Sequence, residues 1–87
     1  MLITRLFPLS DERVVLVHLA SFDWDCTLGK AVTLRQGQQE VRARQVGAGN
    51  HEGHATIALL LDGDWTASLA ELNRMEKAKL PITLEFS

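Results

Sequence analysis

The sequence has little cysteine, no long apolar run and no excess of positive charge. Its single cysteine, Cys26, cannot form a disulfide within the chain, so a reducing compartment such as the cytoplasm is the simplest expectation. The longest apolar runs, such as Val14–Val17 and Ile57–Leu61, are far shorter than the roughly 18 residues of a membrane-spanning helix. The N-terminus also lacks the basic start and apolar run of a signal peptide. We therefore expect a cytoplasmic protein that does not insert into membranes.

The charge balance and the length set two further limits. Nine Lys and Arg against 11 Asp and Glu give a net charge of −2, which argues against a dedicated nucleic-acid-binding protein but still allows a local basic surface. A chain of 87 residues is long enough for one small domain and too short for a multidomain enzyme. With 46% hydrophobic residues, the composition is typical of a folded domain rather than a disordered tail. We predict a single domain over residues 1–87.

The pattern of apolar residues predicts a mainly β protein. Short apolar or alternating segments, most of them bounded by Pro, Gly, Asp or Ser, are typical of strands, and they occur at residues 2–7, 13–20, 30–35, 39–46, 55–61 and 82–86. Segments 13–20 and 55–61 are apolar on both faces, which favours strands in the middle of a core. Gln36–Gln38 is predicted to close a hairpin. Gly47–His54, with three glycines, is predicted to be a mobile exposed loop.

One helix is predicted before the last strand. Ser68 and Glu71 fit a capping box, and Asp64 is an alternative N-cap. Apolar residues then recur at helical spacing to about Lys77, and Pro81 prevents the helix from continuing. A lone helix among strands disfavours a parallel βαβ architecture, and a closed sheet protects its edges. We therefore predict a small six-stranded barrel or β-roll with one short helix before the last strand.

Three segments carry a resemblance to a known family. They are Gly29–Leu34, which begins with a glycine, Val41–Val46, and Glu52–Gly63, in which Gly53 leads into an apolar strand that ends at Gly63. This order resembles the β-barrel that follows the GTPase domain in elongation factor Tu and its relatives, over roughly two-thirds of the chain. The early strand at 13–20 lacks the family's glycines, and no phosphate-binding Gly-x-x-x-x-Gly-Lys-Ser/Thr motif occurs, so GTP hydrolysis is not implied. The resemblance implies a barrel with a docking surface; the tRNA contacts of the family have no counterpart that we can match.

Basic residues on the predicted hairpin are candidates for a partner surface. Arg35, Arg42 and Arg44, with Lys30, would form a basic stripe on its outer face, which is suited to phosphates or an acidic partner. The alternative is an ordinary solvated strand face. Because no aromatic residue is interleaved, the stacking platform of single-strand binders is missing. We regard nucleic acid as the less favoured partner.

Two tryptophans are the other candidates for a partner surface. Trp24 lies in a predicted loop and Trp65 near the start of the predicted helix, where a domain this small can leave large apolar groups uncovered. The favoured alternative is that Trp65 anchors the helix on the barrel. The surface of interest then comprises Arg35, Arg42, Arg44, Trp24 and Trp65.

One segment has the residue types of a metal site. His51 and His54, with Glu52 between them, would need Cys26 or Asp23 to complete a zinc site. The two histidines are three residues apart, whereas a helical His-Glu-x-x-His motif places them four apart. Solvated loop histidines are therefore favoured. A Cys26–histidine nucleophile pair is equally weakly supported, because nothing in the sequence brings the residues together.

The remaining polar candidates have structural explanations. His18 lies inside an apolar strand and is predicted to be a core histidine with a backbone partner. Asp23 and Asp25, and Asp62 and Asp64, form Asp-x-Asp pairs that could bind a hard cation. Turn chemistry, in which aspartate accepts hydrogen bonds from nearby amides, explains both pairs more simply.

The sequence thus favours recognition over catalysis. We expect a non-enzymatic interaction module that binds a protein partner or itself as a homo-oligomer, with no cofactor, no metal and no catalytic residues. One alternative is a translation- or RNA-associated barrel. Another is a metal-binding protein or small enzyme that uses the segment from His51 to His54.

Overall fold

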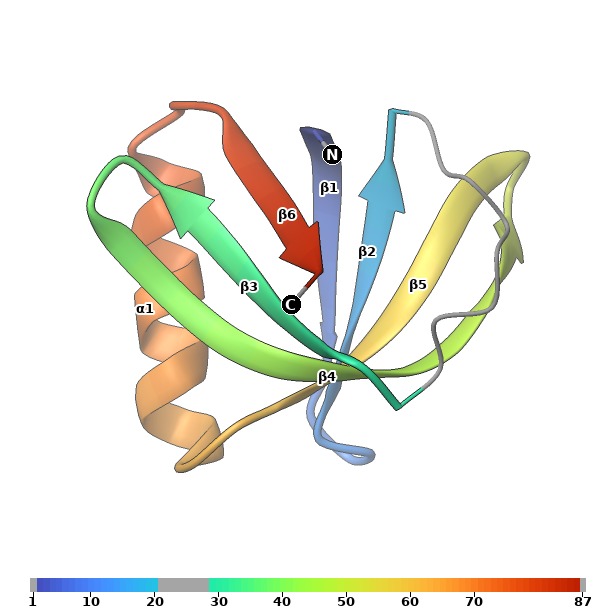
Figure 1. The fold of residues 1–87 in the computed structure, drawn as a ribbon, viewed down its shortest axis with the longest axis horizontal. Coiled ribbons are helices and arrows are strands. Elements are labelled where there is room, and N and C mark those ends of the chain that lie inside the picture. The colour runs from blue at the N-terminus through green and yellow to red at the C-terminus, as the bar shows by residue number, and fades with distance from the viewer. Residues whose placement is uncertain (1, 21–28, 87) are drawn as a thin grey trace.

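The computed structural model describes residues 2–20 and 29–86, with the backbone alone at His51. The described residues form six strands and one helix: β1 (Leu2–Leu9), β2 (Val14–Leu19), β3 (Ala31–Gln36), β4 (Gln39–His51), β5 (His54–Leu61), α1 (Trp65–Lys77) and β6 (Ile82–Phe86). The strands pair in antiparallel fashion into a closed barrel with the order β1-β2-β5-β4-β3-β6 (Figure 1). The predicted six-stranded barrel with one helix before the last strand is therefore confirmed.

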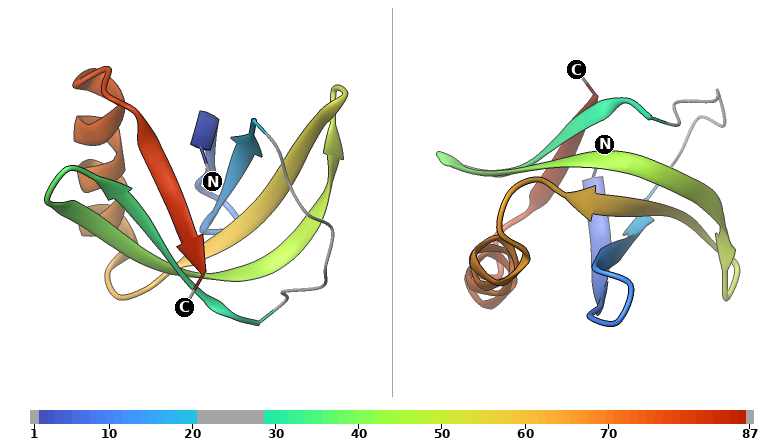
Figure 2. Two further views of the ribbon diagram at one scale, coloured as in Figure 1. Left: turned by 45° about the horizontal axis from the view of Figure 1, so that its top comes forward. Right: turned by 90° about the horizontal axis from the view of Figure 1, so that it is seen from below.

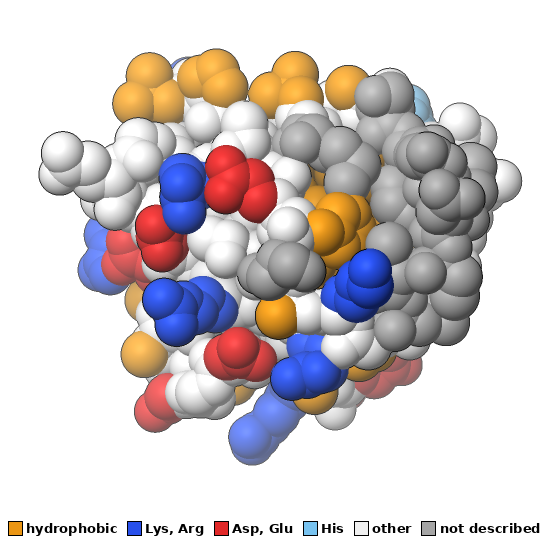
Figure 3. Space-filling view, in the orientation of Figure 1, with side chains coloured by type: hydrophobic (Ala, Val, Ile, Leu, Met, Phe, Trp, Pro, Cys, Tyr) orange, Lys and Arg blue, Asp and Glu red, His pale blue; other side chains and the backbone are white. Residues whose placement is uncertain are grey.

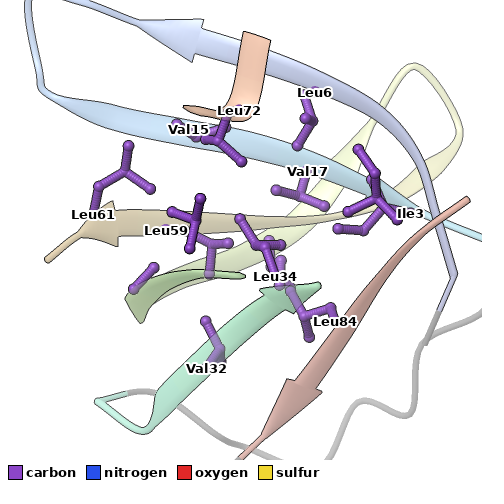
Figure 4. Close-up of a cluster of buried hydrophobic side chains, with 14 of the residues drawn as sticks. Ile3, Leu6, Val15, Val17, Val32, Leu34, Leu59, Leu61, Leu72 and Leu84 are labelled. Carbon is purple, nitrogen blue, oxygen red and sulfur yellow. The ribbon is translucent and has the colours of Figure 1, made fainter. Parts of the chain in front are cut away.

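The alternation of side chains along each strand builds the barrel interior. Val15 and Val17 of β2 and Leu59 of β5 are fully buried, because every second residue of a strand points to the same side of the sheet. Inward-pointing side chains from the other strands and from α1 complete one cluster (Figure 4). The alternation within the β3–β4 hairpin buries Val32 and Leu34 of β3 and Val41 and Ala43 of β4.

The prediction of a loop over Gly47–His54 was wrong. β4 continues to His51, which pairs with His54 at the start of β5, so only Glu52 and Gly53 form the turn. Both turn residues have positive φ, 52° and 79°, a combination that matches the twist of an antiparallel hairpin. The glycines of this segment therefore extend a hairpin instead of loosening it.

Gly47 lies in the ladder beside a β-bulge. The register of β4 against β5 shifts between Gln45 and Gly47, which leaves Val46 as the extra residue. Gly47 stands opposite Ala58, and a Cβ on Gly47 would lie 3.4 Å from the Ala58 Cβ. A side chain at this position would therefore just touch Ala58, at the lower limit of an ordinary van der Waals contact.

The helix covers the weakest seam of the barrel. β1 pairs with β6 only through Leu2↔Thr83 and Ile3↔Ile82. In Figure 1, α1 stands at the left of the barrel, behind the β3–β4 hairpin, and Figure 2 shows the same arrangement from two further sides. Leu72 and Met75 are buried in the core cluster. The helix therefore supplies the apolar side chains that strand pairing does not provide at this seam.

A buried glutamine fixes the end of this helix. The Nε2 atom of Gln36, at the end of β3, donates to the carbonyl oxygens of Met75 at 2.7 Å and Leu80 at 2.9 Å. These carbonyls belong to the last turn of α1 and to the connection into β6. At the end of the helix, the amide of Ala78 donates to the Arg74 carbonyl and the amide of Lys79 to the Glu76 carbonyl. The Met75 carbonyl between them accepts from Gln36 instead. Gln36 is 6% exposed and lies on the inner side of β3 with Val32 and Leu34, although the sequence predicted that it would lie in the hairpin turn.

Asp64 begins the helix, which confirms the alternative N-cap. Its Oδ1 atom accepts hydrogen bonds from the amides of Thr66 at 2.8 Å and Ala67 at 3.3 Å. Ser68, which the capping-box prediction placed at the N-cap, lies inside the helix, and its hydroxyl donates to the Asp62 carbonyl at 3.1 Å. The capping box at Ser68 was therefore wrong, because the helix starts one turn earlier than its motif.

Asp64→Ala is expected to destabilise the protein by about 1 kcal/mol, the usual cost of losing an N-cap side chain. Ser68→Ala, the matched control, should change the free energy of unfolding by less than about 0.5 kcal/mol, because its hydrogen bond is exposed. Urea unfolding of both variants measures the difference. A larger loss for Ser68→Ala would contradict the assignment of the cap.

Candidate interaction surface

The predicted basic stripe lies on one face of the β3–β4 hairpin, but acidic side chains neutralise part of it. Arg35 forms an ion pair with Glu40 at 2.8 Å and another with Glu85 of β6 at 3.5 Å. Figure 3, which views this side of the barrel, shows positive and negative side chains interspersed. The register explains the mixture, because β6 and β4 both flank β3 and bring their carboxylates beside Arg35.

The other arginines of the stripe differ from Arg35. Arg44 is exposed and donates to the Gly29 carbonyl oxygen at 2.7 Å. Arg42 is exposed and makes no ion pair with any of the described residues. Lys30 is exposed just before β3. Arg42 and Arg44 are therefore the positive charges of this hairpin that a partner meets first.

The tryptophans and the zinc candidates are placed only in part. Trp65 is half-buried and packs against the core cluster, in agreement with an anchor for the helix. Trp24, Cys26, Asp23 and Asp25 lie outside the described residues, as does the side chain of His51. Among the described residues, no three His, Cys, Asp or Glu side chains gather as a metal site would require. The metal and nucleophile hypotheses therefore stay predictions.

His18 is buried, as predicted, but on the outer face of the barrel. Its neighbours Val17 and Leu19 point inward, so alternation turns His18 outward, yet its side chain is only 3% exposed. Its ring lies between those of Phe7, at 4.8 Å between centroids, and His54, at 4.9 Å and nearly parallel. Rings from three adjacent strands thus cover one end of the outer face.

Next to this ring stack, the outer face of β1, β2, β5 and β4 is apolar. Strand register aligns one row across the four strands: Phe7, Leu16, Ala58 and Gly47. It aligns a second row two residues further on: Leu9, Val14, Leu60 and Arg44. Leu9 is 36%, Leu60 43% and the bulged Val46 47% exposed. We call this set the outer apolar face: Phe7, Leu9, Val14, Leu16, Val46, Gly47, Ala58 and Leu60.

The outer apolar face is hollowed where its residues are smallest. A hollow of about 290 Å³ lies beside Leu16, Gly47, Gly49 and Ala58. The β1–β2 half of the first row carries the large side chains of Phe7 and Leu16, whereas the β5–β4 half carries a methyl group and a hydrogen atom. The face is therefore raised on one side and lowered on the other.

Charged residues border one end of the outer apolar face. Asp11 and Glu12 are exposed in the turn after Leu9, on the β1–β2 side. Arg42 and Arg44 are exposed on β4, on the opposite side of the same end. Arg13 offsets one of the two negative charges on the β1–β2 side, which therefore stays net negative. Asp62 offsets one of the two positive charges on the β5–β4 side, which therefore stays net positive.

A second hollow, of about 500 Å³, lies at the seam between the start of β1 and the connection from α1 to β6. Leu2 and Leu80, 47% and 62% exposed, lie there beside the charged side chains of Arg5, Glu76 and Lys79. This hollow mixes apolar groups with charges of both signs. The outer apolar face, in contrast, is continuous over four strands.

The sequence signal for the outer apolar face was present but was interpreted differently. Residues 13–20 and 55–61, apolar on both faces, were predicted to be strands buried in the middle of the core. Their inward faces are buried as predicted, but Leu60 is largely exposed and Leu16 and Ala58 are half-buried on the outside. A barrel has no second layer of structure to cover an apolar outer face, and that geometry distinguishes the two interpretations.

Comparison of the chain with family models, curated proteins and solved structures finds no significant match. The resemblance to the elongation factor Tu barrel therefore stays a prediction. None of the helices among the described residues has both the length and the apolar character needed to cross a membrane. The fold and the surface define a closed antiparallel barrel with one apolar outer wall.

Proposed function

We propose that this protein is a non-enzymatic interaction module that binds a protein through its outer apolar face. The observation that carries the proposal is the two rows of the outer face, apolar except for Arg44 at the end of the second, on a wall whose inner side already forms the core. Single exposed apolar residues are ordinary on protein surfaces, whereas a continuous apolar patch marks an interaction site. An aliphatic face of this kind suits another protein surface, since its hollow of about 290 Å³ is smaller than the roughly 300–1,000 Å³ of small-molecule sites.

The chemistry of the outer apolar face favours a protein over a nucleic acid. Nucleic-acid surfaces use unpaired cations for phosphates, and aromatic rings when bases are stacked. Arg35, which the basic-stripe hypothesis needs, forms ion pairs with Glu40 and Glu85.

A photo-crosslinking amino acid at position 60 is expected to capture a protein in the native cell. Leu60 lies in the second apolar row and is 43% exposed, so a partner on this face would lie within reach. The matched control is the same substitution at Gln38, exposed in the β3–β4 turn on the charged side. Mass spectrometry of the adducts identifies what is captured.

Two results decide this experiment. An identified adduct at position 60, absent at position 38 and lost when Leu16→Lys is added on the same face, supports the proposed function. Equal adducts at both positions, or none at position 60, would contradict it. Thermal unfolding of each variant establishes that the barrel is intact.

A further inference from the structure

We propose that the occupant of the outer apolar face is a second copy of this chain, packed as a symmetric dimer. The proposal rests on the proposed function and names the partner. The two-fold axis runs parallel to the strands, between β2 and β5. It places β1 of one copy over β4 of the other, and β2 over β5, so that two sheets pack face to face in an aligned arrangement.

The shape of the outer apolar face is self-complementary about this axis. In the first row, the large side chains of Phe7 and Leu16 lie on the β1–β2 half, and the small residues Ala58 and Gly47 lie on the β5–β4 half. Rotation about the axis therefore places Leu16 over Ala58 of the other copy and Phe7 over Gly47. The hollow of about 290 Å³ beside the small residues gives room for the large ones.

The charges at the end of the face obey the same symmetry. The axis brings the Asp11–Glu12 turn of one copy to the side of Arg42 and Arg44 of the other, and it does so twice in the dimer. Arg13 precedes Val14 of β2, and Asp62 follows β5, which pairs with β2. The axis therefore also brings Arg13 of one copy to the side of Asp62 of the other. Opposite charges thus meet at the turns of this end, whereas within the second row Leu9 of one copy faces Arg44 of the other. The complementarity of the turns fixes the orientation of the complex.

The area of the face indicates a weak dimer. Four strands about 4.8 Å apart and two rows about 7 Å apart cover on the order of 270 Å² of flat area per copy. Side-chain relief and the charged end bring the total buried by both copies to roughly 700 Å², which is below the range of stable interfaces and fits a weak, transient one. We therefore expect a dimer that dissociates at micromolar concentrations and weakens as salt screens its charged end.

The test exchanges charges between the two sides of the face. One variant carries Asp11→Lys and Glu12→Lys, and the other carries Arg42→Glu and Arg44→Glu; all four residues are exposed. Each variant alone would bring like charges together twice and should dimerise at least about tenfold more weakly than the original chain. When the two variants are mixed, opposite charges again meet on both sides of the charged end, and a heterodimer should form. Sedimentation velocity up to about 1 mM protein measures all four states.

The outcomes separate the dimer from the proposed function. Recovery of the heterodimer in the mixture supports a second copy as the occupant and the proposed two-fold axis. Loss of the dimer in Leu60→Lys shows that the dimer interface is the outer apolar face. A chain that stays monomeric at about 1 mM overturns the dimer, yet leaves the proposed function standing if position 60 captures a different protein. Charge variants that dimerise as the original chain does overturn the axis. Unchanged melting temperatures exclude unfolding as the cause.

Discussion

Met75→Ala is expected to lower the free energy of unfolding by about 2–5 kcal/mol, the range found when a large buried apolar side chain is truncated. Met75 is fully buried, and it projects from α1 into the core cluster. β1 and β6 are joined at only two residue pairs beside the helix, so few strand hydrogen bonds there offset the lost packing. The loss is a large part of the roughly 5–15 kcal/mol of a typical domain.

Thermal and urea unfolding measure this effect. Each kcal/mol corresponds to about 4–8 °C in a domain of this size, so the melting temperature should fall by more than about 8 °C. Asn73→Ala provides the matched control, since Asn73 is exposed on the same helix, and it should change stability by less than about 0.5 kcal/mol. Similar losses in the two variants would show that α1 does not seal the barrel.

The seal matters for the proposed function because the outer apolar face depends on the core behind it. Leu16 and Ala58 point outward between residues such as Val15, Val17 and Leu59, which are fully buried on the inner side of the same strands. Loosening the inner packing would let the four strands shift relative to one another. A face whose raised and lowered halves must match a second copy needs those strands held in register.

Alternation within single strands was enough to predict most of the barrel. Val32 and Leu34, or Val41 and Ala43, reveal their inward side within one segment, because the period of two is a local property. The end of the helix was equally local, since Pro81 follows it closely. What these elements share is that their signal lies within a few residues.

Features that depend on register could not be predicted in the same way. Leu16, Ala58 and Gly47 become neighbours only when β2, β5 and β4 pair, and nothing local to any one of them shows that they form a row. The ion pair of Arg35 with Glu85 likewise joins β3 to the last strand. The candidate surface was therefore predicted in the hairpin, whose neighbours are close in sequence, while the apolar wall was missed.

Glycine-based reasoning failed at the β4–β5 turn for a related reason. Three glycines in eight residues favour a loop when the chain is considered alone. In the barrel, β5 offers a continuous partner for β4 up to the pair of His51 and His54. Ladder hydrogen bonds then outweigh the conformational freedom of glycine, and the missing side chains create the hollow in the outer apolar face.

Gln36→Leu is expected to destabilise the protein by about 2–4 kcal/mol although leucine has a similar volume. The substitution removes the donor that reaches the carbonyl oxygens of Met75 and Leu80 and leaves both acceptors without it. An unsatisfied buried polar group costs about 1–3 kcal/mol, and the extra apolar surface of leucine offsets part of the sum. The loss should be concentrated where α1 passes into β6.

Hydrogen exchange provides the readout that distinguishes this anchor from general packing. In Gln36→Leu, the amides of residues 78–80 and of Ile82 should exchange faster than those of the β2–β5 ladder, because their region opens before the barrel does. Gln38→Leu, in the exposed turn two residues further on, is the matched control and should leave both rates unchanged. Uniform acceleration across the whole chain would instead mean that Gln36 supports the core as a whole, and stability equal to the original chain would mean that its two hydrogen bonds contribute nothing. A selective effect would establish that a polar side chain at the end of β3 holds the helix over the seam, and with it the wall on which we place the interaction.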